Sequence, residues 1–160
     1  MNAWRIDEER GAAALLVVLW LPVLLASLSL VVNLGHILVS RSRLQAAADM
    51  AALAAVQSVD WEAMTEGEVR LVRDLADANA RDYAVANLRS LLDRDPEDLE
   101  VRVINAAPDA PGTHPLTGSP LEYPTVVVRV SARGPGLWFG GDSGAFILRA
   151  EADASLRPRE

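Results

Sequence analysis

The sequence predicts an α+β protein built on one long N-terminal helix, and three observations support that prediction. Residues 11–40 contain no Asp, Glu, Lys or Arg. The segment after them keeps a helical spacing of small apolar residues, and the C-terminal third changes to an alternating pattern. We therefore expect a transmembrane helix that continues into a soluble domain with a second helix and a small antiparallel sheet.

The apolar segment predicts a single membrane-spanning helix over residues 11–40. About 20 apolar residues cross the hydrocarbon core of a bilayer, and this segment has 30 residues. A cleaved signal peptide has a shorter apolar core, and a core helix of a small soluble domain has an apolar stripe rather than apolar residues all round. Pro22 lies inside the segment and is expected to kink the helix locally, because proline lacks the N–H donor.

The flanking charges leave the orientation of the span open. Arg5 and Arg10 precede it and Arg41 and Arg43 follow it, so the positive-inside rule does not choose a side. Long domains after a span are translocated largely regardless of their charge. We therefore expect residues 1–10 to form a cytoplasmic tail, the span to lie in the inner (cytoplasmic) membrane, and the remainder to be extracytoplasmic.

Residues 41–60 predict a water-exposed extension of the same helix. Ala47, Ala51 and Ala55 recur every four residues, a spacing that lets another backbone come close. Gln45 and Asp49 add a polar strip to this surface. A neighbouring helix from another protein would use these positions, so Ala51→Leu is expected to disturb assembly and leave the soluble domain folded. An ordinary linker helix is the alternative.

Residues 61–160 predict an extracytoplasmic α+β domain. Thr65 and Glu68 have the spacing of a capping box at a helix start, and the helix should end before Pro96. Its expected apolar face comprises Leu71, Leu75, Ala78, Val85, Leu88 and Leu92. Alternating patterns predict three strands, near residues 99–103, 126–130 and 146–154. Residues 106–124 are rich in proline and predict an irregular loop.

Composition argues against several classes of function. A formal net charge of −7 and a pI near 4.8 argue against a nucleic-acid partner. The chain has no cysteine, so a thiolate metal site is excluded, and we expect no metal, no cofactor and no enzymatic activity. His36 is expected at the membrane interface or facing a partner, and His114 in solvent. The glycine-rich residues 134–144 lack the Lys-Ser/Thr of a phosphate-binding loop, and their two aromatic side chains, Trp138 and Phe139, should pack against the sheet.

Several ordered elements of residues 9–55 carry a family resemblance. They are Arg10-Gly11 at the start of the span, Leu21-Pro22 within it, Val32-Asn33-Leu34-Gly35 near its end, and the alanine-rich residues 44–54. This region resembles the N-terminal region of TadE/TadG-like proteins of Flp-type pilus assembly. Asn33 stands where the family often has an acidic residue. Processed pseudopilins of these systems carry a glutamate shortly after the cleavage-site glycine, whereas Ala12–Leu16 follow Gly11 here, and this second departure argues against cleavage after Gly11 and favours the TadG-like side.

The resemblance implies a structural, membrane-anchored pseudopilin-like or minor-pilin-like component of a Tad (Flp) type pilus assembly or a related secretion system. Its partners would be other pilin-like or Tad assembly proteins, contacted through the N-terminal helix, together with the lipid bilayer. The expected interaction residues are Pro22, Asn33, Gln45, Ala47, Asp49, Ala51 and Ala55. The alternative is a membrane-anchored extracytoplasmic binding protein that is not part of a filament.

Overall fold

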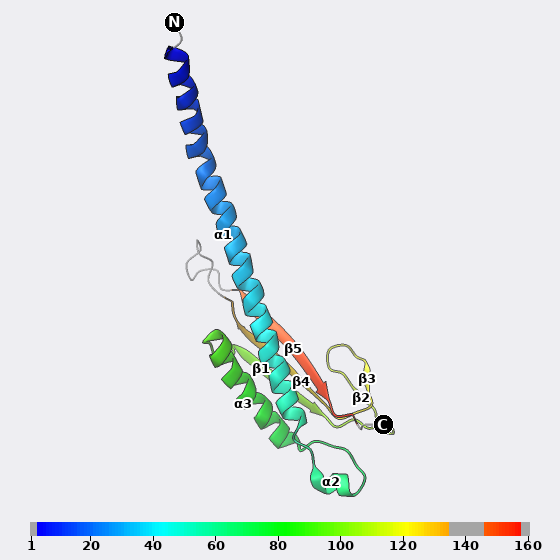
Figure 1. Cartoon of the computed structure of the whole chain (residues 1–160). Helices are drawn as coiled ribbons and strands as arrows, with labels where there is room; N and C mark the ends of the chain where they lie inside the picture. The colour runs from blue at the N-terminus through cyan, green and yellow to red at the C-terminus, as the bar shows by residue number, and fades with distance from the viewer. Residues whose placement is uncertain (1–2, 135–145, 158–160) are drawn as a thin grey trace.

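The computed structural model describes residues 3–134 and 146–157, with side chains from residue 13 onward. Its dominant element is helix α1, Ala3–Val56, which stands out from the rest of the molecule as a rod (Figure 1). At 1.5 Å per residue the rod is about 80 Å long. It passes through Pro22 as one continuous helix, which confirms the long N-terminal helix, and it already begins within the predicted tail, residues 1–10.

Two shorter helices follow α1, and the predicted capping box is not the start of either. Helix α2, Trp61–Thr65, is capped by Asp60, whose carboxylate accepts a hydrogen bond from the Ala63 amide at 3.1 Å. Thr65 ends this helix, and its hydroxyl donates to the Glu62 carbonyl. Helix α3, Arg73–Leu92, begins after Val72 without a side-chain cap. The spacing of a capping box was therefore coincidental, because α2 uses Thr65 at its other end.

The buried face of α3 is made mostly of small residues, and the predicted apolar face is correct only in part: Leu71, which precedes α3, and Leu88 are buried, and Val85 and Leu92 are half-buried. Leu75 is 49% exposed, and Ala78 is also exposed. The side chains that are buried recur every four residues: Ala76, Ala80, Ala84 and Leu88. Alanine at three successive turns lets α3 approach α1 closely, and the larger leucine is left outside the contact.

The three predicted strands are present and form one antiparallel sheet. They are β1, Asp98–Ile104, β4, Thr125–Arg133, and β5, Ile147–Ser155, in the order β1-β4-β5. The segment between β1 and β4, predicted as irregular, contains a short hairpin of β2, Gly112–Thr113, and β3, Pro120–Leu121. Trp138 and Phe139 lie outside the described residues, so their predicted packing stays a prediction.

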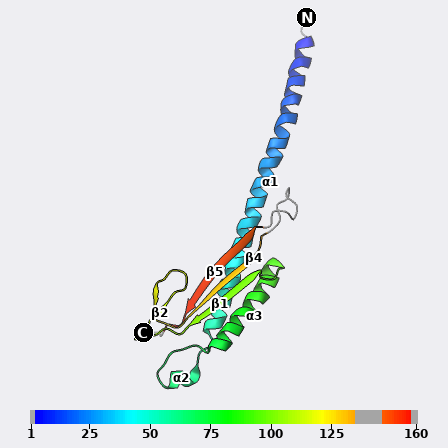
Figure 2. The same cartoon turned by 180° about the vertical axis from the view of Figure 1, so that it is seen from behind.

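Helices α1 and α3 cover one face of the sheet (Figures 1 and 2). The alternate residues of each strand point into this layer and form the core with α1 and α3. The strand residues that are fully or largely buried there are Val126, Val128, Val130, Ala132, Leu148, Ala150, Ala152 and Ala154. The C-terminal part of α1 is thus an integral part of the soluble domain, whereas its N-terminal part stands free.

Candidate functional site

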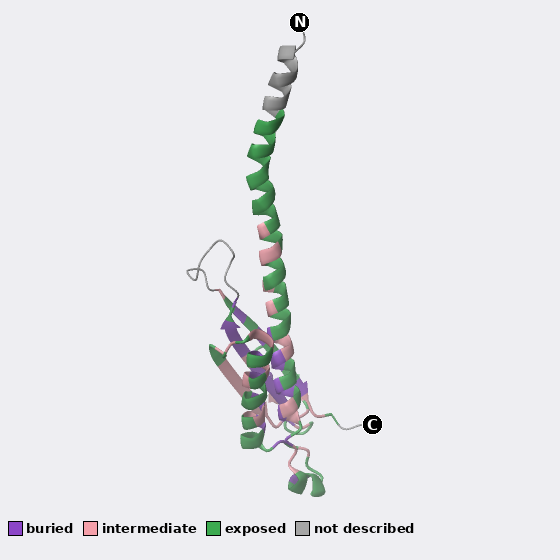
Figure 3. Cartoon of the chain, turned by 60° about the vertical axis from the view of Figure 1, so that its left-hand side comes forward, coloured by how far each residue is buried: buried purple, intermediate pink, exposed green. Residues whose placement is uncertain are grey.

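The free part of α1 has the properties of a membrane span. Most of its large apolar side chains between residues 15 and 39 are at least half exposed, Val32 and Ile37 being half-buried, and Figure 3 shows most of this stretch as exposed. Among the described residues, α1 is the one helix long and apolar enough to cross a membrane. A continuous helix pairs its backbone polar groups internally, as the interior of a bilayer requires; the exception is the carbonyl one turn before Pro22, which loses its donor.

The span meets the soluble domain abruptly at residues 40–44. Ser40 is half-buried and Leu44 is fully buried in the core. Between them the Arg43 guanidinium donates to the Leu91 carbonyl at 3.2 Å, in the last turn of α3. Residues 11–40 measure about 45 Å as a helix, the thickness of a bilayer with its headgroups. A span of this length would place the soluble domain directly against the membrane surface.

The alanines predicted to contact another protein are instead buried by contacts within the chain itself. Ala47, Ala51 and Ala55 have no exposed surface, because α1 packs against α3, β4 and β5. The predicted close approach of backbones therefore occurs, but the helix that approaches is the chain's own α3. These three positions do not offer a surface to a neighbouring subunit. The sequence spacing indicated a tight contact and could not indicate whose helix makes it.

The predicted polar strip fixes α1 to the sheet. The Gln45 side-chain amide donates to the Asp49 carboxylate at 3.0 Å and to the Glu151 carbonyl of β5 at 2.7 Å. Asp49 is exposed, so of the pair it is the side chain that remains accessible to a partner. Gln45 instead acts as a bridge between α1 and the edge of the sheet.

The two predicted positions inside the span lie on the free part of α1. Pro22 is exposed, and Asn33 is half-buried, with its side-chain nitrogen 3.5 Å from the Ser29 hydroxyl one turn earlier. That contact partly satisfies the amide inside an apolar environment. His36 is exposed near the same end of the span, and its place at the membrane interface or against a partner stays a prediction.

A groove between α1 and α3 is a surface that the sequence did not reveal. It has a volume of about 500 Å³ and faces away from the sheet. Met50 and Leu53 of α1 and Leu75 and Tyr83 of α3 line it, and each of these side chains is about half exposed. The apolar residues left out of the core on both helices thus meet on one side. Only the pairing of the two helices brings them together.

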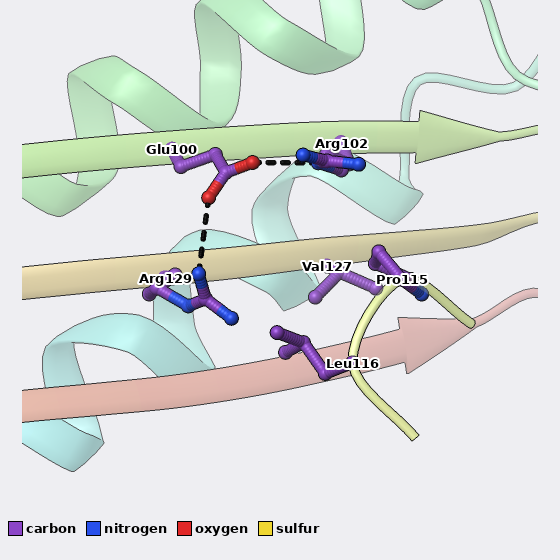
Figure 4. A pocket seen from close by; sticks show the side chains of 6 residues that line it. All are labelled: Glu100, Arg102, Pro115, Leu116, Val127 and Arg129. Atoms are coloured by element: carbon purple, nitrogen blue, oxygen red, sulfur yellow. Dashed lines mark hydrogen bonds and ion pairs between the residues drawn. The ribbon is translucent and has the colours of Figure 1, made fainter. Parts of the chain in front are cut away.

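The opposite face of the sheet carries a row of charges and a small pocket (Figure 4). Glu100 accepts from Arg102 at 2.6 Å and from Arg129 at 3.3 Å, and Arg129 lies 3.7 Å from Glu151. Pro115 and Leu116 cover the neighbouring Val127, leaving a pocket of about 90 Å³. The pocket is smaller than those that usually hold a drug-sized ligand.

His114 belongs to the loop that covers this face, and the prediction that it is solvated is wrong. Its side chain is 8% exposed. Its Nδ1 accepts from the amides of Leu116 and Thr117 at 3.4 and 3.3 Å. These contacts give the imidazole a local structural role, because it caps the turn that leads from β2 to β3.

Among the carboxyl groups of the described side chains, Asp60 is the one with a clear electrostatic perturbation. The Ala63 amide donates to it and lowers its pKa, and the Arg70 guanidinium, 3.0 Å away, lowers it further. Arg70 also contacts Glu68 at 3.5 Å. This arrangement at the end of the domain far from the span (Figure 1) stabilises the short helix α2 and the turn after it.

The fold and these surfaces define a membrane-anchored α+β protein whose soluble domain is folded onto the second half of its own anchor. The comparison with known families identifies the anchor: residues 11–58 match the TadE/G-like Flp pilus-assembly family. The matched segment comprises the span and the part of α1 that enters the core, and it confirms the resemblance seen in the sequence. The match supports a role in pilus assembly. No curated protein and no solved structure matches the chain.

Proposed function

We propose that this protein is a structural, non-enzymatic component of a Tad (Flp) type pilus assembly or related secretion system, similar to a pseudopilin or minor pilin. The family match over residues 11–58 is the observation that carries the proposal. The rod-and-domain architecture supports it, because the matched helix both anchors the chain and organises the domain's core.

The proposed topology is a single pass through the inner (cytoplasmic) membrane with the N-terminus in the cytoplasm. Residues 44–157, the polar part of the chain, would then lie outside the membrane and against its outer surface. A labelling experiment tests this directly, because the chain has no cysteine of its own. Ser119→Cys in the exposed β2–β3 hairpin should react with a membrane-impermeant maleimide in intact spheroplasts, and Asn2→Cys should react only after lysis.

The proposed mode of action is lateral packing against other pilin-like or Tad assembly proteins. Since Ala47, Ala51 and Ala55 are buried in the domain, the surface available for packing is the free part of α1 together with the groove lined by Met50, Leu53, Leu75 and Tyr83. A partner helix laid in this groove would cover apolar area that is now exposed to water, which favours association.

Co-purification of the full-length protein from membranes tests the packing surface. Leu53→Asp places a charge in the groove and should reduce the recovery of pilus-assembly partners. Leu116→Asp is the matched control, because Leu116 is also an exposed leucine but lies on the opposite face of the sheet. Equal recovery with both variants, at normal membrane levels, contradicts the groove as the packing surface.

The alternative proposal, a binding protein outside any filament, has one structural feature in its favour. A groove of about 740 Å³ lies between the α2–α3 connection and the segment after β1, and Arg73, Asn105 and Tyr123 contribute to its walls. A ligand bound there would contact the domain only. If Tyr123→Ala abolished the cellular role while Leu53→Asp left it intact, the binding protein would be the better description.

A further inference from the structure

The two edges of the sheet form a matched pair of docking strands. Within the described part of the chain, β1 and β5 are each paired on one side only, with β4 between them. Both are antiparallel to β4, so β1 and β5 run in the same direction. Unpaired edges carry backbone donors and acceptors that can accept another strand.

Two side chains from the helices show which backbone groups point outward. The Glu151 carbonyl of β5 accepts from Gln45, and the Leu99 carbonyl of β1 accepts from Arg81 at 3.3 Å. In an antiparallel ladder the N–H and C=O of one residue point to the same side, so alternate residues from Glu151 and from Leu99 face away from β4. Each carbonyl has a second lone pair and can still accept a bond from a docked strand.

The membrane anchor restricts which edges can meet. Copies in one bilayer keep their α1 rods pointing the same way, and the strands run lengthwise beside α1 (Figures 1 and 2). Two β5 strands related by a two-fold axis would pair antiparallel and point the rods in opposite directions. Pairing β5 with the β1 of a second copy keeps both rods parallel, because these strands run in the same direction.

We propose that β5 of one copy pairs in parallel with β1 of the next, so that a second copy of this chain is the partner of each edge. The inference deepens the proposed function and rests on its membrane-anchored, multi-copy character. The proposed contact is head-to-tail rather than a closed dimer. It can repeat, because after one contact each of the two copies still has one unpaired edge strand.

Charges on the outer face of the sheet select the register of this contact. In a parallel pair, a residue whose backbone N–H and C=O point toward the partner strand lies opposite a residue whose backbone groups point toward its own sheet. Glu151 can therefore lie level with Asp98, Glu100 or Arg102 of the second copy. The first two alternatives oppose like charges. Alignment with Arg102 opposes unlike charges, and it also brings Arg149 level with Glu100.

This register gives the contact an axial step. Within one chain, Glu100 and Glu151 are both level with Arg129. Placing Glu151 level with Arg102 of the second copy shifts that copy by two residues, about 7 Å along the strand. Arg149 is exposed and makes no ion pair among residues 13–134 and 146–157, so its charge is available for Glu100 of the second copy.

Disulfide cross-linking of the full-length protein in native membranes tests the contact, because the only thiols are those introduced. A chain carrying both Glu100→Cys and Arg149→Cys should form a ladder of covalent multimers on mild oxidation. Paired strands lie about 4.8 Å apart, within the range of disulfide Cα separations. Inside one chain the two cysteines lie on either side of β4 and are offset by two residues along the strands, which places them about 12 Å apart, too far for a bridge.

Register and orientation have their own controls. Arg149→Cys combined with Asp98→Cys or with Arg102→Cys should give at least fivefold less multimer than the pair with Glu100→Cys. Arg149→Cys alone should give no dimer, whereas a two-fold contact between β5 strands centred on residue 149 would cross-link it. A dimer from this single variant, or the highest yield in another register, overturns the proposal.

Co-purification of two differently tagged copies separates this inference from the proposed function. Tagged copies that co-purify from membranes without any ladder overturn the edge contact and leave lateral packing in place. If the copies do not co-purify and no ladder forms, the edge contact is also overturned. If the protein is absent from the membrane fraction, the proposed function as a membrane-anchored component is overturned.

Discussion

Ala51→Leu is the variant whose expected effect changes most once the structure is considered. Ala51 has no exposed surface and belongs to the core formed by α1, α3 and the sheet. Leucine adds three carbon atoms at a contact where the facing helix also presents buried alanines, Ala76, Ala80 and Ala84. The substitution is therefore expected to push the two helices apart inside the domain, rather than to block a neighbouring protein.

The magnitude follows from the cost of overpacking a tight core, about 1–3 kcal/mol. Because 1.4 kcal/mol corresponds to a tenfold change, the slowest amides of α3 should exchange with solvent roughly 5- to 150-fold faster. Hydrogen exchange measured by mass spectrometry on the full-length protein in nanodiscs reports this quantity, since the slowest amides exchange through opening of the core.

Ala78→Leu is the matched control, because Ala78 is an exposed alanine on the same helix, α3. A surface substitution of this kind changes stability by no more than about 0.5 kcal/mol, so exchange should stay within about a factor of two or three. If Ala51→Leu left α3 as well protected as Ala78→Leu does, the close contact of α1 with α3 would be refuted.

Three further predictions follow from hydrogen bonds of the domain. Gln45→Ala removes the bond to the Glu151 carbonyl and should cost about 1 kcal/mol, seen as faster exchange in β5; Gln57→Ala, an exposed glutamine of the following turn, should not. Asn105→Ala removes two 2.9 Å bonds to the backbone of Leu71 and should cost about 1–3 kcal/mol; Asn87→Ala, which removes a single bond to the Tyr83 carbonyl within α3, is the control and should cost less. The pKa of Asp60 is lowered in the folded protein. The stabilisation that its helix cap gives to α2 is therefore fully present above the unfolded pKa and is lost as the pH falls through the folded pKa. A carboxyl NMR titration that gives an ordinary or raised pKa for Asp60 contradicts this.

Much of the fold was predictable because its signals are local. A run of 30 residues without charge has few solutions other than a span, and period-2 patterns at Leu99–Val103 and Val126–Val130 identified strands that the structure contains. What failed depended on tertiary contacts. The face of α3 was assigned from its large residues, whereas the proximity of α1 selects its alanines. His114 is buried by a turn that forms only when β2 meets β3.

The candidate site shows the same limit more sharply. The spacing of Ala47, Ala51 and Ala55 correctly indicates that a backbone comes close, but it contains no information about which backbone. The groove at Leu53 and Leu75 and the matched edges at Arg149 and Glu100 each combine residues far apart in the chain. Such surfaces become visible only when the elements are placed in three dimensions.

The division of α1 into two environments bears on where assembly specificity can reside. Lipid tails are as apolar as leucine side chains, so the free part of α1 gains no hydrophobic driving force from meeting another helix in the bilayer. In water the groove between α1 and α3 does gain that driving force, and the charged edge strands add a choice of register. Because the span keeps every copy pointing in one direction, these weak surfaces of the domain need only select a neighbour. The anchor thus limits the orientation of the contact, and the domain determines its partner.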